Sequence, residues 1–162
     1  MPRDKAIALR VNGKEVETTV PPHRTLLEAL RELGHMEVKS GCEKGDCGAC
    51  AVLIDDVALD SCLTLAWTVE GREITTVSGL GSSDDPHPLH KSFADKGAVQ
   101  CGYCTPGLII AAHSMIREIP EPDEADIRLG LSGNLCRCTG YGKVFEAVTG
   151  AAAVMRGEGG GQ

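Results

Sequence analysis

Eight cysteines are the residues most able to do chemistry in this 162-residue chain, because thiolates bind soft metal ions and iron–sulfur clusters. They fall into two sets of four, one between positions 42 and 62 and the other between positions 101 and 138. In a reducing compartment such thiols serve as metal ligands more often than as disulfides. The sequence therefore predicts two metal centres with four ligands each.

The spacing of the first set is specific. Three cysteines follow one another as Cys-x4-Cys-x2-Cys in a glycine-rich loop, and a fourth comes after eleven residues; they are Cys42, Cys47, Cys50 and Cys62. This is the plant-type pattern for a [2Fe–2S] cluster, in which each iron takes two protein sulfurs. Glycines let the loop fold around the cluster and direct amide hydrogens toward it. A zinc site is the alternative, although zinc favours paired Cys-x2-Cys units.

The spacing of the second set is less specific. Two close pairs are separated by 31 residues, and the four members are Cys101, Cys104, Cys136 and Cys138. Each pair is expected on a turn beside a helix, where positive helix ends can stabilise a negatively charged cluster. On spacing alone, a four-cysteine zinc site competes with a second [2Fe–2S] cluster. Taken together, two such sets on one short chain indicate electron transfer, since a [2Fe–2S] centre carries one electron.

No catalytic residue is expected in this chain. Three serines, Ser40, Ser61 and Ser132, lack the strand–turn–helix context of a nucleophile, and no phosphate-binding glycine loop precedes a helix. The histidines contain no pair at the i, i+4 spacing, so metal binding is not expected of them. These residues are His23, His35, His87, His90 and His113.

Composition excludes several classes of protein. A formal charge of −7 argues against binding to nucleic acid, which needs a surplus of Lys and Arg. The sequence shows neither an apolar run of about 18 residues nor a secretory signal, so no membrane insertion is expected and a cytoplasmic location is predicted. Only five side chains are Phe, Trp or Tyr. Two small domains with so few large side chains need metal clusters as organising centres.

Alternating apolar residues predict β-structure in the first half. The alternation from Ile7 to Val20 is interrupted by Asn12 and Gly13, a pair that favours a two-residue hairpin turn. Thr25 and Glu28 form a capping box and predict the start of a helix. A second hairpin and a last strand are predicted over residues 51–59 and 74–77.

A change of composition divides the chain. Residues 79–88 are rich in Gly, Ser, Asp and Pro, which is typical of a connector, and helical periodicity follows. Four helices are expected, beginning near Leu89, Thr105, Asp123 and Val144, with Thr105 as an N-cap and proline at the first helical position. The predicted fold is α+β, a β-rich half followed by an all-helical half. The expected domains are residues 1–79 and 89–156, with a linker over 80–88 and a flexible tail over 157–162.

Three motifs around the cysteines resemble those of a known family. They are Gly41-Cys42 with Cys47-Gly48-Ala49-Cys50, then Gln100-Cys101-Gly102-Tyr103-Cys104-Thr105-Pro106-Gly107, then Gly133-Asn134-Leu135-Cys136-Arg137-Cys138-Thr139-Gly140-Tyr141. In this order, they closely resemble the iron–sulfur small subunit of molybdenum hydroxylases, the family of xanthine dehydrogenase, aldehyde oxidase and carbon monoxide dehydrogenase. The resemblance covers about residues 5–155. It implies a plant-type ferredoxin-like β-grasp domain followed by a four-helix bundle, each with one [2Fe–2S] cluster.

The resemblance also implies partners and a route for electrons. A large subunit with the molybdopterin cofactor would oxidise the substrate, and a medium subunit with FAD would usually receive the electrons. Electrons would pass through the cluster of the second cysteine set and then through that of the first. Gln100 matches the glutamine that hydrogen-bonds the pterin, and Cys138 matches the cysteine ligand closest to it. A heterotrimer or its dimer is the expected assembly.

One competing hypothesis is a protein that works without a large subunit, either a free-standing [2Fe–2S] electron carrier or a structural four-cysteine zinc module. A stable complex with a much larger molybdenum-containing chain would exclude the free carrier. The substrate of a complex is set by its large subunit, because purines, N-heterocycles, aldehydes and carbon monoxide are all handled by large subunits with this kind of small partner.

Overall fold

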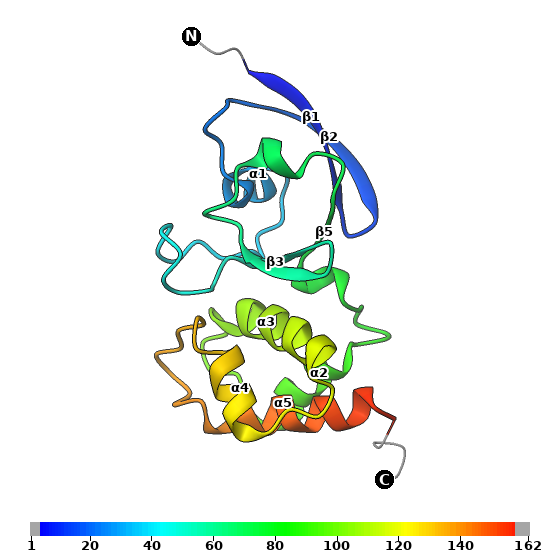
Figure 1. Ribbon diagram of the computed structural model, residues 1–162, viewed down its shortest axis with the longest axis vertical. Helices are drawn as coiled ribbons and strands as arrows, with labels where there is room; N and C mark the ends of the chain where they lie inside the picture. The colour runs from blue at the N-terminus through cyan, green and yellow to red at the C-terminus, as the bar shows by residue number, and fades with distance from the viewer. Residues whose placement is uncertain (1–3, 158–162) are drawn as a thin grey trace.

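The computed structural model describes residues 4–157, so almost all of the predicted tail over 157–162 lies outside the described residues. A β-rich half and a helical half are stacked end to end, and one helix of the second half lies directly against the sheet of the first (Figure 1). This arrangement confirms the predicted α+β class and the order of its two halves.

The first half is a five-stranded mixed sheet with strand order β2-β1-β5-β3-β4. Its strands are β1 (Lys5–Val11), β2 (Lys14–Val20), β3 (Ala51–Ile54), β4 (Val57–Asp60) and β5 (Glu73–Thr75). β5 runs parallel to β1 and antiparallel to β3, which joins the two hairpins into one sheet. Helix α1 (Leu26–Glu32) buries its leucines in the core of this half. Two short 3₁₀ helices, η1 (Ala66–Val69) and η2 (Val77–Gly79), flank β5.

Both predicted hairpins are confirmed. Asn12 and Gly13 have φ values of 51° and 74°, and Asp55 and Asp56 have values of 48° and 70°. Positive φ at both central positions gives a turn whose twist matches that of the flanking strands. The last strand is shorter than predicted and ends at Thr75. The amide of Thr76 donates to the Asn12 side chain at 2.8 Å, so it is not available for the sheet ladder.

The capping box that predicted α1 is present, because Thr25 and Glu28 each accept a hydrogen bond from the other's backbone amide. Four helices follow as predicted, α2 (Pro88–Asp95), α3 (Thr105–Glu118), α4 (Glu124–Gly130) and α5 (Gly142–Met155). The prediction of Thr105 as the N-cap of α3 is wrong by one residue, because Cys104 is the N-cap and Thr105 is the first helical residue. The carbonyl of Cys104 accepts the first bond of the helix, from the Leu108 amide at 3.0 Å. A cysteine therefore lies at the first turn of α3.

Each half has its own core of buried side chains. The core of the first half is mainly aliphatic and includes two cysteines, Cys50 and Cys62. The core of the second half gathers side chains of all four helices, Phe93 among them, and Val77 and Leu80 from the preceding segment pack against it. Within residues 4–157, no helix is long and apolar enough to cross a membrane.

Candidate metal centres

Each set of four cysteines is arranged as two pairs. In the first half, the neighbouring Cys47 shifts the pKa of the Cys42 thiol, and the neighbouring Cys62 shifts that of Cys50. In the second half, Cys104 is paired with Cys136, and the sulfurs of Cys101 and Cys138 are 3.6 Å apart. The fold thus brings together residues from two distant segments of the sequence. We name the two groups the ferredoxin-half site and the helical-half site.

Two pairs per site fit a [2Fe–2S] cluster, because each of its two irons takes two protein sulfurs. A single zinc ion would instead need four donors that converge on one point. The observed pairing is thus the arrangement that suits a two-iron centre at each site.

The ferredoxin-half site has a buried end and a loop end. Burial raises the pKa of the Cys50 thiol to about 12, and Cys50 and Cys62 both belong to the hydrophobic core. At the other end, backbone amides of Lys44 and Asp46 donate to Cys42 and lower the pKa of its thiol to about 7. Loop amides therefore stabilise one thiolate, whereas a bound cation must compensate for the buried one.

The helical-half site is more open. Cys101 and Cys138 are exposed, and Cys104 and Cys136 are half-buried. Burial raises the pKa of Cys104 to about 12, with a further increase from its neighbour Cys136. Burial also disfavours the thiolate of Cys136, but hydrogen bonds from Thr139 outweigh that effect and lower its pKa to about 7. The exposed pair lies at the surface, and the half-buried pair packs against the core of the helical half.

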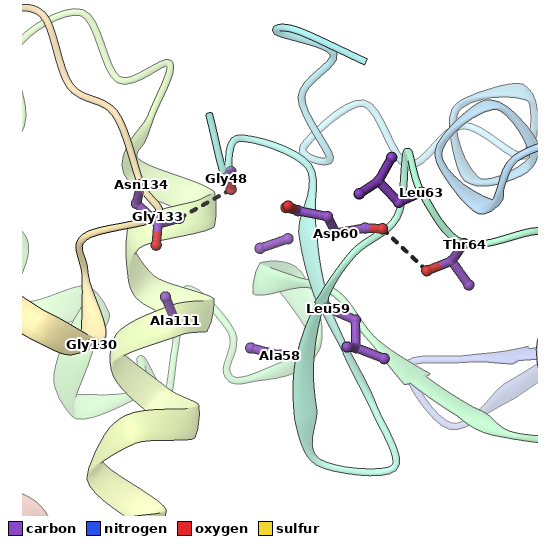
Figure 2. A pocket seen from close by; sticks show the side chains of 11 residues that line it. Gly48, Ala58, Leu59, Asp60, Leu63, Thr64, Ala111, Gly130, Gly133 and Asn134 are labelled. Carbon is purple, nitrogen blue, oxygen red and sulfur yellow. Dashed lines mark hydrogen bonds between the residues drawn. The ribbon is translucent and has the colours of Figure 1, made fainter. Parts of the chain in front are cut away.

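A direct hydrogen bond connects the loops of the two sites. The amide of Leu135 donates to the carbonyl of Cys47 at 3.0 Å, and the Asn134 side chain donates to the carbonyl of Gly48 at 3.1 Å. Figure 2 shows this second contact, between the segment that follows α4 and the loop that leads into β3. Cys47 of one site and Leu135, the residue before Cys136 of the other, are therefore in direct backbone contact.

Two glycines allow this close approach. Gly48 has a φ of +66°, and a Cβ atom there would also overlap with the Asn134 side chain and the carbonyl of Gly133. Gly107, in the first turn of α3, lies so close to Gly48 that a Cβ atom would overlap with the Gly48 carbonyl. Neither position has room for any other residue.

Further contacts fix the two halves against each other. The hydroxyl of Tyr103 donates to the carbonyl of Ser40 at 2.5 Å, which ties the two cysteine loops at a second point. Beyond the loops, Arg117 of α3 pairs with Asp56 in the turn between β3 and β4 at 2.9 Å. A groove of about 570 Å³ remains between β4 and the end of α4, lined by Asp60, Leu63 and Asn134 among others (Figure 2).

Sequence reasoning missed this junction. Asn134 and Gly107 are part of the cysteine motifs, but nothing in their spacing indicates that they meet Gly48 across the domain boundary. Gln100 lies on the surface, directly before Cys101, and forms no hydrogen bond within residues 4–157. Three histidines gather where α2 begins beside α3: the N-cap residue His87, His90 of α2 and His113 of α3, with neighbouring ring centroids 5.0 and 6.0 Å apart.

Comparisons with known proteins agree with this geometry. Residues 9–77 match the family described as "2Fe-2S iron-sulfur cluster binding domain", and residues 76–149 match the "[2Fe-2S] binding domain" family. The chain is 46% identical to one of the nicotinate dehydrogenase subunits of Pseudomonas putida, covering 93% of this chain and 96% of that one. It is 45% identical to the xanthine dehydrogenase iron-sulfur-binding subunit of Escherichia coli O157:H7, with 88% and 91% covered.

A solved structure extends the similarity to the fold. The aldehyde oxidoreductase of Desulfovibrio desulfuricans superposes with a TM-score of 0.91 at 40% identity, covering 95% of this chain and 17% of that longer one. Both halves and both cysteine sites are included in these matches. The chain belongs to the iron–sulfur small subunits of the molybdenum hydroxylases, which carry two [2Fe–2S]-binding domains and transfer electrons for a larger molybdopterin-containing partner.

Proposed function

We propose that this chain conducts single electrons from the molybdopterin centre of its large partner to an FAD subunit, through the helical-half site and then the ferredoxin-half site. When bound, each [2Fe–2S] cluster supplies one-electron chemistry. The proposed ligands of the helical-half cluster are Cys101, Cys104, Cys136 and Cys138. Those of the ferredoxin-half cluster are Cys42, Cys47, Cys50 and Cys62.

The hydrogen bond between Leu135 and Cys47 is the observation that carries this proposal. Electron tunnelling falls steeply with distance and is faster through bonds than across gaps. From Cys136, the backbone leads through one peptide unit to the Leu135 amide, which donates to the Cys47 carbonyl at 3.0 Å. The route between the two proposed ligands therefore crosses only one non-covalent contact. Asn134 and Gly48 hold that contact in place through their own hydrogen bond.

The exposed pair of the helical-half site supports electron arrival from a partner. Cys101 and Cys138 lie at the surface, so a second protein can approach them. Gln100 is adjacent, exposed and without a hydrogen-bond partner within residues 4–157, and we assign its amide to the pterin of the large subunit. Cys138 is then the ligand closest to that pterin.

The partner subunits are also part of the proposal. The similar aldehyde oxidoreductase carries this fold as 17% of a longer chain, which supports a large molybdopterin-binding partner here. A separate FAD subunit, assembly as a heterotrimer or its dimer, and a cytoplasmic location are parts of the proposal. The domain bounds of residues 1–79 and 89–156, with a linker over residues 80–88, are also proposed.

Co-expression with a molybdopterin-binding large subunit and an FAD-binding medium subunit of this family tests the proposal. We expect a stable complex with molybdenum in the large chain and about four irons and no zinc in this chain. A chain that stays alone under these conditions, yet contains four irons, would instead be a free electron carrier. Stoichiometric zinc without visible absorbance would identify a structural zinc module.

Replacement of Gln100 tests the direction of electron arrival. In the assembled complex, Gln100→Ala should leave both clusters and their iron content intact, but slow their reduction by substrate, because the contact to the pterin is lost. Rapid mixing with substrate and observation of cluster bleaching measures this step. Reduction of both clusters by dithionite, which bypasses the molybdenum centre, serves as the control. Loss of the clusters themselves would make Gln100 a folding residue.

A further inference from the structure

A side-chain hydroxyl contacts a proposed ligand of the helical-half site. The Thr139 hydroxyl oxygen lies 3.1 Å from the sulfur of Cys136, and the Thr139 amide approaches the same sulfur at 3.5 Å. Within residues 4–157, no serine or threonine hydroxyl has such a contact with a sulfur of the ferredoxin-half site. The two sites thus differ in one specific donor.

The direction of this hydrogen bond follows from its neighbours. The amide of Tyr141 donates to the Thr139 oxygen at 3.2 Å, so the oxygen acts as an acceptor there and its own hydrogen is left for the sulfur. A cysteine that ligates iron carries no hydrogen, so it can only accept. With a cluster bound, Thr139 is therefore the donor and Cys136 the acceptor.

Tyr141 holds this turn from two sides. Its hydroxyl accepts the Cys136 amide at 2.7 Å and donates to the Asn134 carbonyl at 3.0 Å. Its backbone has a φ of +67°, which a tyrosine adopts only when its surroundings require it. The ring stacks on Phe145, with centroids 6.0 Å apart. These contacts fix the position of the amide that orients the Thr139 hydroxyl.

We infer that Thr139 raises the reduction potential of the helical-half cluster through its hydrogen bond to the Cys136 sulfur, and that Tyr141 is the positioning residue for this bond. This inference rests on the proposed function, because it requires Cys136 as a ligand. A hydrogen bond to a ligand sulfur withdraws negative charge and favours the reduced cluster, whose charge is more negative by one. The oxidised cluster, with less charge on its sulfur, gains less from the same bond.

Thr139→Val tests the inference in the complete complex, because valine has nearly the shape of threonine but no hydroxyl. At a fixed solution potential we expect the ratio of reduced to oxidised helical-half cluster to fall about tenfold, which corresponds to about 59 mV for one electron. The ferredoxin-half cluster, titrated in the same sample by electron paramagnetic resonance, should keep its potential. Thr139→Ser restores the hydroxyl and should restore the potential.

Vibrational spectra give a second readout that does not depend on activity. Exchange into D₂O should shift the Fe–S(Cys) stretching bands of the wild type, and Thr139→Val should lose part of that shift. An unchanged potential in Thr139→Val would overturn the inference. Loss of the helical-half cluster in both Thr139→Val and the smaller Thr139→Ala would also overturn it, since Thr139 would then serve folding alone.

The proposed ligand set can fail separately from this tuning effect. If Cys136→Ser retained a normal helical-half cluster, Cys136 would not be a ligand and the proposed function would need a new assignment. Loss of that cluster in Cys136→Ser, together with an unchanged potential in Thr139→Val, would overturn only the role of Thr139.

Discussion

The two cysteine sites solve the same chemical problem in different ways. In the ferredoxin-half site, three cysteines lie within nine residues and two of the four thiols belong to the hydrophobic core. In the helical-half site, two distant pairs meet on turns beside helices, and two of the four thiols are exposed. The first site is therefore part of the folding core of its half, whereas the second lies at the edge of the core of the other.

This difference matches the roles that we propose. An exposed site can receive electrons from another protein, and a site further inside can pass them on within the chain. The surroundings of the sulfurs differ as well. The Cys50 sulfur lies 3.6 Å from a carboxylate oxygen of Asp60, while the Cys136 sulfur has the Thr139 hydroxyl at 3.1 Å. Thr139 thus favours the reduced helical-half cluster and Asp60 disfavours the reduced ferredoxin-half cluster, so these two groups oppose the proposed onward step rather than drive it.

Replacement of a single cysteine ligand should show the difference between the two sites most clearly. Both Cys50→Ser and Cys101→Ser should reduce the iron content from about four to about two per chain. Because Cys50 is part of a core, Cys50→Ser should also lower the melting temperature of its half far more than Cys101→Ser lowers that of the helical half. Iron analysis and thermal unfolding measure the two effects. Equal destabilisation by both variants would contradict the comparison.

A methyl group at the junction should disturb both sites together. Gly107→Ala places a Cβ atom against the carbonyl of Gly48 and should cost about 3 kcal/mol of unfolding free energy. It should also slow electron exchange between the clusters, because the adjacent Cys47 carbonyl moves with that of Gly48. Gly142→Ala, in the first turn of α5 with open space around it, is the matched control. It should be neutral or slightly stabilising, by less than about 1 kcal/mol. If the two variants behave alike, the junction is not tight.

Acid should affect the helical half selectively. Burial and the nearby His113 and His90 lower the pKa of His87 to about 4, and burial lowers the pKa of the other two histidines. Arg117 and Asp56 are the charged groups that face His113. The unfolded chain binds protons near pH 6.5, before the folded chain does, so stability should fall from about pH 6.5 to about pH 4 and then level off.

A variant of the cluster of histidines checks this dependence. In the wild type, the Leu89 amide donates to the His87 ring, and the Asn side chain of His87→Asn can still accept this bond. The variant should therefore lose less stability than the wild type between about pH 6.5 and about pH 4. His23→Asn, in the first half, should leave the profile of the helical half unchanged. Denaturant unfolding at several pH values measures both. An identical profile in His87→Asn and the wild type would show that another group senses acid.

The smallest expected effect concerns Asp60. Asp60→Asn removes a negative charge next to the Cys50 sulfur and should raise the potential of the ferredoxin-half cluster, with the helical-half cluster unchanged. Asp95→Asn, on the exposed surface of α2, is the control for the change in net charge. Redox titration of both clusters gives the answer. A shift of equal size in the control would assign the effect to net charge alone.

Local signals in the sequence account for most of the fold. Asn12-Gly13 predicted the first hairpin, and Thr25 with Glu28 predicted the start of α1, because each depends on contacts between near neighbours. The predicted N-cap at Thr105 was wrong by one residue, since Cys104 already has helical geometry. A one-residue shift of this kind depends on packing that the sequence pattern does not contain.

The sites were only partly predictable. The cysteines were visible as sets of four, but their pairing within each set depends on the fold. The contact between Leu135 and Cys47, and the fit of Gly107 against Gly48, join residues that are far apart in the sequence. His87 and His113 likewise meet from two helices, so a search for spacing on one helix could not find them.

Burial of Cys50 and Cys62 has a consequence for biogenesis. These two side chains are only 2% and 6% exposed, so an iron–sulfur scaffold cannot reach them once the first half has closed. We expect iron to be delivered there while that half is still folding. Cys101 and Cys138 stay accessible afterwards, and the Leu135 amide docks on the carbonyl of Cys47 only when the first loop has formed. We therefore expect the ferredoxin-half cluster to be inserted before the helical-half cluster.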